Sequence, residues 1–234
     1  MLVVMYRIWE SGFAAVSPPG PSELNPADWI AWHFTHLGNV SSIAGRAALV
    51  CHSMGFPHVD IADHGIKNDR LSRRIDLPHP YPESVVGDHV PFYLAPRSPM
   101  LYRIANERHD QKSLVYFGVR LGDLIPEVTW CVSDGNARSE FTEFCASLDR
   151  VGSFVDFSTL KLKYWKSAED SDRTRRRQAE LLVHGRLPVS LVRYVVCKAD
   201  ETLAAARQAL GVVGGMMQYQ VEPRNYFMEI PDDR

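Results

Sequence analysis

The order of the strand-like and helix-like segments constrains the fold of this chain more than any other feature. Aromatic and β-branched runs predict strands at Trp29–Phe34, Leu114–Leu121 and Leu191–Cys197. Helix-like spacing recurs between them at irregular intervals, and no glycine-rich phosphate loop joins a strand to a helix. The pattern therefore predicts an α+β domain rather than a doubly wound α/β domain.

Length and charge set limits on what the chain does. Its 234 residues, 45% hydrophobic and 23% charged, are typical of an ordinary globular protein, so we expect one domain over 1–234 with an irregular lead-in over 1–28. A net charge of −2 excludes a general polyanion binder and confines nucleic-acid contacts to local patches, Arg70–Arg74 and Arg173–Arg177. The opening Met1–Tyr6 run is too short for a signal peptide or a membrane span, so we expect no membrane attachment.

The cysteines and histidines do not form a metal site by spacing. The four cysteines lie far apart and contain no CxxC pair, which favours free, buried thiols in a reducing cytoplasm: Cys51, Cys131, Cys145 and Cys197. The histidines scattered between Cys51 and Pro82 lack the HxxxH spacing that zinc sites use. We therefore expect no metal.

Three other segments carry expectations about local structure. The apolar spacing of Val40–Leu49 and of Phe141–Leu148 predicts a helix in each. The stretch Cys51–Pro82 is polar and irregular, which inside a compact domain indicates a binding loop or lid. Tyr226–Ile230 is predicted as a last strand or coil before an acidic tail.

A single carboxylate stands between a basic cluster and an apolar run. Glu180 follows Arg175–Arg177 and precedes Leu181–Val183, so a strand would hold it rigidly beside an anion-binding face. A catalytic carboxylate needs such an environment. The alternative is that Glu180 pairs with Arg176 or Arg177 on a solvated surface, as charge runs usually do. Both interpretations remain open on the residues alone.

The strand with His33 and Thr35, the irregular basic loop with Arg70–Arg74 and the proline-rich turn with Arg97 can converge with Glu180 on one cleft. His33 and Thr35 alternate in a strand and so share one face. In the proline-rich block before the helix expected at Pro99, Arg97 either caps carbonyl groups or contacts a phosphate. Asn136 follows an Asp-Gly turn, where its amide can also merely satisfy backbone groups.

Together these segments resemble the DarT family of DNA ADP-ribosyltransferase toxins. The matching segments occur in family order between Trp29 and Val196, and they are His33–His36 with Asn39, Val90–Tyr102, Ser133–Ala137 and Arg175–Val183. The resemblance implies an ADP-ribosyltransferase fold with two facing β-sheets, flanking helices and NAD in the cleft. It further implies a bacterial cytoplasmic toxin that transfers ADP-ribose from NAD to a base in single-stranded DNA, with thymine expected, and a macrodomain antitoxin that removes the modification.

The resemblance also implies roles for individual residues. Glu180 becomes the catalytic carboxylate, and Arg70 the essential arginine of the NAD-covering loop, preferred over Arg73 and Arg74 by its spacing from Ile66. The residues expected to bind NAD are His33, Thr35, Asn39 and Arg70. Those expected to contact DNA are Tyr93, Arg97, Asn136 and Arg175, with Asn136 standing where other members carry His.

Two other functions stay open. The first is a related transferase acting on guanine, RNA or protein, because the variable loop Lys166–Thr174 is expected to set specificity. The second is a non-catalytic module that binds single-stranded nucleic acid without consuming NAD. Aromatic side chains such as Tyr93, Tyr164 and Trp165 would contact bases in either kind of nucleic-acid-binding protein.

Overall fold

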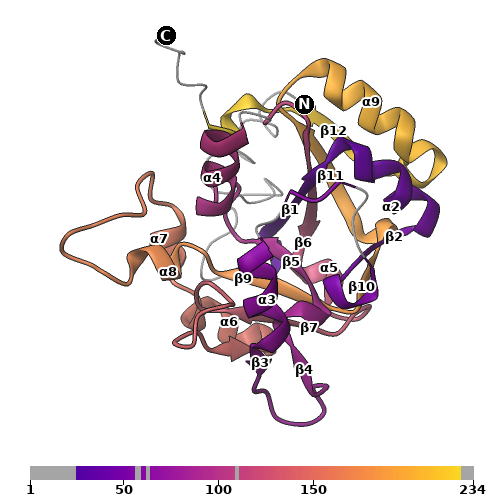
Figure 1. Ribbon diagram of the computed structural model, residues 1–234. Coiled ribbons are helices and arrows are strands. Elements are labelled where there is room, and N and C mark those ends of the chain that lie inside the picture. The colour runs from indigo at the N-terminus through magenta and orange to yellow at the C-terminus, as the bar shows by residue number, and fades with distance from the viewer. Residues whose placement is uncertain (1–24, 56–58, 62–63, 109–110, 228–234) are drawn as a thin grey trace.

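The computed structural model describes residues 25–55, 59–61, 64–108 and 111–227. Its main element is an eight-stranded sheet with the order β12-β11-β6-β1-β5-β9-β7-β8 (Figure 1). These strands are β1 (Ile30–His36), β5 (His89–Tyr93), β6 (Leu114–Arg120), β7 (Trp130–Ser133), β8 (Phe144–Cys145), β9 (Glu180–His184), β11 (Val192–Cys197) and β12 (Gln218–Val221). Two short ribbons pair β2 (Ala48–Val50) with β10 (Arg186–Pro188), and β3 (Arg74–Ile75) with β4 (Ser84–Val85). The predicted α+β class is confirmed.

The large sheet has a narrow joint in its middle. Strand β1 pairs with β6 along its whole length, from Ile30 opposite Arg120 to His36 opposite Leu114. Its pairing with β5, in contrast, consists of Trp32 opposite Tyr93. At this single pair the sheet divides into two four-stranded halves, β12-β11-β6-β1 and β5-β9-β7-β8; that the two halves face each other stays an expectation.

Helices pack around the sheet, and α2 and α9 lie together on one side of it (Figure 1). The α-helices are α2 (Val40–Arg46), α3 (His64–Ser72), α4 (Pro99–Arg108), α5 (Leu121–Leu124), α6 (Leu148–Phe154), α7 (Phe157–Leu160), α8 (Arg173–Arg176) and α9 (Asp200–Leu210). Short 3-10 turns are η1 (Pro26–Asp28), η2 (Leu37–Asn39), η3 (His52–Met54), η4 (Val86–Asp88), η5 (Val189–Leu191), η6 (Gly211–Gly214) and η7 (Pro223–Asn225).

Trp32 fixes the joint between the two halves. Its side chain is fully buried, and it lies opposite Gly118 of β6. A Cβ atom at Gly118 would lie 2.8 Å from Cζ3 of Trp32, closer than carbon atoms pack. Glycine therefore leaves the space in which the indole ring packs, and the buried ring holds the joint at which Tyr93 is placed.

Three predictions about local structure were wrong in part. The helix expected over Val40–Leu49 ends at Arg46, because Ala47 adopts a left-handed φ of 49° and the chain then enters β2. The helix expected over Phe141–Leu148 is absent from this described segment: Phe144–Cys145 forms β8 against β7, and the helix begins only at Leu148. The stretch expected to be irregular, Cys51–Pro82, contains α3 and β3, which tertiary packing stabilises without an apolar stripe in the sequence.

Two predictions concern the ends of the chain. Residues 25–28 of the expected lead-in are described and form η1, whereas the rest of the lead-in lies outside the described residues. At the other end, Tyr226 and Phe227 follow η7 without strand pairing between described residues, and the remainder of Tyr226–Ile230 lies outside them.

Candidate active site

Glu180 is the first residue of β9 and is almost completely buried, with 2% of its surface exposed. Nη1 of Arg70 donates to its carboxylate at 2.9 Å and 3.2 Å, and the backbone N–H of Ala137 donates to Oε1 at 3.2 Å. Its own backbone N–H donates to Oγ of Ser133 at 2.9 Å. The carboxylate is therefore held from two elements in addition to its own strand.

Arg70 is the arginine of the basic run that reaches Glu180, and its expected role in covering NAD stays a prediction. It lies near the end of α3, and its Nη2 is buried without a hydrogen-bond partner among the described residues. Arg73 instead donates to the carbonyls of Ser139 and Thr142, and Arg74 has a side chain that is 68% exposed. Arg70 thus neutralises Glu180 through Nη1 and keeps Nη2 as a donor without a partner among the described residues.

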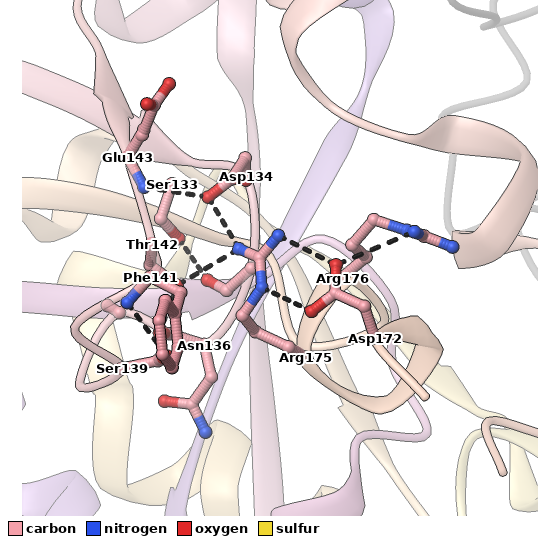
Figure 2. A network of polar contacts seen from close by, with 12 residues as sticks. Ser133, Asp134, Asn136, Ser139, Phe141, Thr142, Glu143, Asp172, Arg175 and Arg176 are labelled. Atoms are coloured by element: carbon pink, nitrogen blue, oxygen red, sulfur yellow. Dashed lines mark hydrogen bonds and ion pairs between the residues drawn. The ribbon is translucent and has the colours of Figure 1, made fainter. Parts of the chain in front are cut away.

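The three arginines before Glu180 do not pair with it. Figure 2 shows the guanidinium of Arg175 between two carboxylates: Nε donates to Asp172 at 2.7 Å, and Nη1 donates to Asp134 at 2.8 Å. Arg176 donates to Asp170 at 2.6 Å and also pairs with Asp156. The simple surface ion pair with Arg176 or Arg177 is therefore wrong, and the rigidly held carboxylate is the correct interpretation of Glu180.

A cavity of about 240 Å³ lies beside β1. Its walls come from β1, η2, α2, β2, β5 and α4, and they include His33, Thr35, Asn39, Arg46, Pro91, Tyr93, Met100 and Ile104. Tyr93 connects this cavity to the carboxylate, because it stands opposite Glu180 in the pairing of β5 with β9. Residues opposite each other in neighbouring strands share one face of the sheet.

His33 and Thr35 lie together in the cavity wall, and their expected contact with NAD stays a prediction. The ring of His33 is partly buried, and its burial lowers the pKa of the imidazole below its ordinary value. Nδ1 lies 2.9 Å from the carbonyl oxygen of Pro91. Because a carbonyl only accepts, Nδ1 carries the proton in the neutral ring, and Nε2 is left as an acceptor.

Asn39 also lines this cavity, but its side-chain amide is hydrogen-bonded to other residues of the protein. Its Nδ2 donates to Oγ1 of Thr35 at 2.9 Å and to the carbonyl of Val59 at 2.8 Å, and its Oδ1 accepts from the N–H of Val59 at 2.7 Å. Asn39 therefore ties β1 to the segment around Val59. Direct binding of a ligand by its amide stays a prediction.

The predicted DNA contacts fall into different surroundings. Tyr93 is next to Glu180, and burial, followed by the charge of that carboxylate, raises the pKa of its phenol. Asn136 donates to Oε1 of Gln178 at 3.1 Å beside the Arg175 network. Arg97 lies on another surface, described next, and burial lowers its pKa. The structure does not gather all four predicted contacts into one place.

Two grooves border the segment from residue 161 to 179, which runs from α7 to β9 and is called the α7–β9 segment. The polar groove, of about 1020 Å³, is lined by the end of this segment, by α3 and by the chain around Phe141. The aromatic groove, of about 820 Å³, is lined by the beginning of the segment, by α4 and by the chain after β12. Asn136 and Arg175 line the polar groove, and Arg97 lines the aromatic groove.

Sequence reasoning missed several groups at this site. Ser133 supports the strand start by accepting from Glu180 and donating to the carbonyl of Gly135 at 2.7 Å. The N–H of Ala137 binds the carboxylate, and Arg46 brings a cation to the cavity. The Ser133–Ala137 motif indicated that this turn belongs to the site. The sequence could not show which backbone N–H binds the carboxylate, because that contact does not depend on the type of side chain. Arg46 lay in a predicted helix with nothing to distinguish it.

Two searches of the described residues bear on metals and membranes. No group of three or more His, Cys, Asp or Glu side chains among them is placed to hold a metal ion. Within the same part of the chain, every helix is too short or too polar to cross a lipid bilayer. The four cysteines are buried and unbridged, as their spacing predicted.

Comparison with known proteins identifies the family. The family model described as "ssDNA thymidine ADP-ribosyltransferase, DarT" matches residues 32–228. The DNA ADP-ribosyl transferase of Mycobacterium tuberculosis (strain ATCC 25618 / H37Rv) is 41% identical over 224 residues, which are 93% of this chain and 97% of the relative.

Solved structures share the fold. Thermus sp. 2.9 DarT in complex with ADP-ribosylated ssDNA matches with a TM-score of 0.78 at 21% identity, over 85% of this chain and 96% of that one. The same Thermus protein in complex with NAD+ matches with a TM-score of 0.74 at 19% identity, over 85% and 98%.

The fold and the family match therefore define the protein as an ADP-ribosyltransferase, the class of enzyme expected. The chain belongs to the DarT family of DNA ADP-ribosyltransferases. The prediction that NAD is the donor substrate of this family is confirmed, since the Thermus protein was solved with NAD+.

Proposed function

We propose that this protein transfers ADP-ribose from NAD to thymine in single-stranded DNA, with Glu180 as the catalytic carboxylate. One observation carries the proposal. Glu180 is buried at the start of β9, fixed by Arg70 and by the N–H of Ala137, and stands opposite a tyrosine that lines the cavity beside β1. A carboxylate held in this way is prepared for a charge that develops at a fixed point.

The residues of the cavity fit one half of a dinucleotide. Its volume of about 240 Å³ is below that of sites that enclose a whole drug-sized ligand. The nicotinamide half would enter between β1 and β5, with Nε2 of His33 as an acceptor. Arg46, which is exposed at the cavity, supplies a cation for the pyrophosphate. The unused Nη2 of Arg70 offers a donor for a ligand oxygen beside Glu180.

The chemistry asks two tasks of Glu180. When the bond from ribose to nicotinamide breaks, nicotinamide leaves with the electron pair and positive charge develops on the sugar. The Glu180 carboxylate stabilises that charge and fixes the sugar by accepting from a ribose hydroxyl. When a ring nitrogen of thymine then bonds to the anomeric carbon, its proton passes to a base. The side-chain amide of Asn136 is no base at neutral pH, which leaves Glu180 for this task.

We further propose that this activity makes the protein a toxin of the bacterial cytoplasm, where both NAD and DNA are available. The family resemblance supports a macrodomain antitoxin that removes the modification. Expression of the wild-type protein in bacteria should stop growth, and co-expression of an ADP-ribose-removing macrodomain should restore it. Growth that is equally good with wild-type protein and with Glu180→Gln would contradict the toxin assignment.

The direct test uses intact mass. Purified protein is incubated with NAD and a panel of single-stranded DNA, duplex DNA and RNA oligonucleotides that differ in base content, and the gain of one ADP-ribose is measured. We expect the gain on thymine-containing single strands and its loss in Glu180→Gln. Glu201→Gln, on the exposed side of α9, is the matched control and should keep the activity. A gain on guanine, RNA or protein alone would replace the proposed substrate.

A further inference from the structure

Arg177 is the one arginine of the Arg175–Arg177 run that meets no carboxylate among the described residues. It is 94% buried, since 6% of its surface is exposed. Its Nε donates to the carbonyl of Leu162 at 3.4 Å, and its Nη1 is buried without a hydrogen-bond partner in the described part of the chain. Buried charges are ordinarily paired, so an orphaned guanidinium indicates that an anion belongs nearby.

A second guanidinium lies close to the first. Burial and the neighbouring charge of Arg97 together lower the pKa of Arg177 to about 10. Arg97 itself lines the aromatic groove, and Leu162, which Arg177 binds, directly precedes Lys163 in the wall of the same groove. Two arginines thus converge at this wall, one in the groove and one behind it. Such a pair suits a phosphate.

The charge of the aromatic groove distinguishes it from the polar groove. Four cations line the aromatic groove, with no carboxylate among its described lining residues: Arg97, Lys163, Lys166 and Arg224. Arg224 is paired with Glu222, which stands outside the lining, so the excess charge of the groove comes from Arg97, Lys163 and Lys166. The polar groove has equal numbers of both signs, namely Arg73, Arg74, Arg138 and Arg175 against Asp69, Asp76, Glu140 and Asp172. A polyanion is therefore attracted to the aromatic groove and gains little at the polar groove.

Besides positive charge for a phosphate, the aromatic groove has aromatic rings against which a base can stack. Tyr102, Trp165 and Phe227 contact one another edge to face, with centroid distances of 5.1 to 5.9 Å. Tyr164 stands beside them with 69% of its surface exposed, and Nζ of Lys163 lies 5.2 Å from its ring centroid. Exposed rings between cations are the usual surface for bases of a single strand.

The groove is also in reach of the proposed active site. Pro99 and Tyr102 of α4 line the aromatic groove, whereas Met100 and Ile104 of the same helix line the cavity beside β1. One helix, about 10 Å wide, therefore separates the two, and a strand of a few nucleotides spans that distance. The α7–β9 segment links them as well, since it begins in the groove and ends at Glu180.

We propose that the aromatic groove binds a nucleotide of the DNA strand next to the target base, with its base against Tyr164 and Trp165 and its phosphate at Arg97, where the buried charge of Arg177 behind the wall adds to the attraction. This inference rests on the proposed transfer to single-stranded DNA. It assigns the strand a path from Glu180 over α4. It also gives a role to the buried charge of Arg177, for which the described residues provide no carboxylate.

Binding of a fluorescein-labelled, thymine-containing 12-mer, measured by anisotropy without NAD, tests the groove apart from the chemistry. Tyr164→Ala removes an exposed ring and should weaken binding about five- to hundredfold, the range measured for base stacking on aromatic side chains. Phe141→Ala is the matched control, because this ring is 84% exposed in the polar groove. It should change the dissociation constant less than twofold.

A cross-linking experiment locates the strand directly. A 12-mer carrying 5-iododeoxyuridine beside the target thymine is irradiated on the protein, and the modified peptide is mapped. We expect cross-links at Tyr164 or Trp165. Cross-links at Phe141, or equal losses of affinity in the two alanine variants, would overturn the assignment. An acidic peptide that competes as well as the 12-mer would also overturn it.

The outcomes separate this inference from the proposed function. If the wild-type protein modifies thymine and Tyr164→Ala binds DNA normally, the groove assignment fails and the proposed function stands. If the protein binds the 12-mer through Tyr164 but transfers no ADP-ribose to any oligonucleotide, the proposed function fails and the groove remains a single-strand site.

Discussion

Arg175 and Arg177 are two residues apart on the α7–β9 segment, and their surroundings are opposite. Arg175 donates to Asp172, Asp134 and Thr142 in the network of Figure 2. Arg177 is more deeply buried, meets the carbonyl of Leu162 and lies near a second arginine. An arginine side chain therefore stabilises the folded protein at position 175, where carboxylates neutralise it. At position 177 it lowers the stability of the folded protein, because its charge is buried without a carboxylate among the described residues.

The two arginines show that the cations of one basic cluster have different roles, depending on whether the protein supplies their counter-charge. A cation that the protein has already neutralised holds a loop in place and has little left for a ligand. A cation that is buried without a carboxylate raises the free energy of the unliganded protein, and a bound anion offsets this. The residues that shape the site and the residues that bind substrate can therefore alternate within one short segment.

The largest effect on transfer is expected at the ion pair between Arg70 and Glu180. Arg70→Met removes the partner of Glu180, so the carboxylate loses its orientation, and transfer should fall by about two to three orders of magnitude. Arg74→Met, in the same basic run but largely exposed, should keep transfer within twofold. Initial rates by intact mass provide the measurement. Equal losses in both variants would mean that the basic run acts only through its overall charge.

The comparison of the two arginines is tested next by stability. Arg175→Met leaves Asp134 without its cation and should lower the free energy of unfolding by about 2 kcal/mol, as for charged hydrogen bonds at partly exposed sites. Arg177→Met replaces a buried charge by an apolar side chain and should leave stability unchanged or raise it by about 1 kcal/mol. Urea unfolding monitored by circular dichroism measures both. A larger loss in Arg177→Met would reverse the comparison.

A buried base without a carboxylate can also respond by losing its proton, as His89 does. This ring is almost fully buried between Tyr81 and the carbonyl of Val85, and burial lowers its pKa to about 4. The unfolded chain binds a proton near pH 6.5, so stability is complete above that pH and declines as the pH falls towards 4.

This decline sets a measurable pH dependence. Between pH 7 and pH 5 the free energy of unfolding should drop by about 2 kcal/mol through His89. His89→Gln keeps a polar side chain there and should remove most of the drop. Urea titrations at pH 7 and pH 5 measure this change. An equal loss of free energy of unfolding between the two pH values in His89→Gln and in the wild type would contradict the prediction.

The smallest effect sharpens the comparison at the level of binding. Arg177→Met should weaken binding of the labelled 12-mer about tenfold and reduce the slope of log affinity against log salt by about 1, because the phosphate at Arg97 loses the positive charge behind it. Arg175→Met, if folded at the assay temperature, should leave that slope unchanged. An unchanged slope in Arg177→Met would mean that its charge meets no phosphate.

The sequence was sufficient where local pattern and tertiary structure agree. Leu114–Leu121 and Leu191–Cys197 were predicted as strands, and β6 and β11 lie in the middle of one half of the sheet, where burial on both faces requires continuous apolar runs. His33 and Thr35 were placed on one face by alternation, and both reach the cavity. Glu180 stood out because it separates a basic cluster from an apolar run, and the structure places it at the start of a buried strand.

What the sequence could not give depends on distant contacts. Helix α3 has a weak apolar stripe, so no periodicity announced the element that brings Arg70 to Glu180. Phe141 was expected inside a helix but is exposed at the polar groove, because β8 pairs with β7 only three residues later. Nor could charge alone separate Arg175 from Arg177, because Asp134, which Arg175 binds in addition to Asp172, lies 41 residues before it, and Arg97, the cation near Arg177, lies 80 residues before that residue.

The α7–β9 segment has a consequence for how such enzymes change over time. Its last residue leads directly into Glu180, while β9 is paired on both edges, with β5 and with β7. Under the proposed path of the strand, the residues at the start of this segment that line the aromatic groove can change and alter which strand is bound, while the pairing of β9 and the partners of Arg175 keep Glu180 in position. We therefore expect that exchange of residues 161–166 between relatives transfers target preference without altering the reaction.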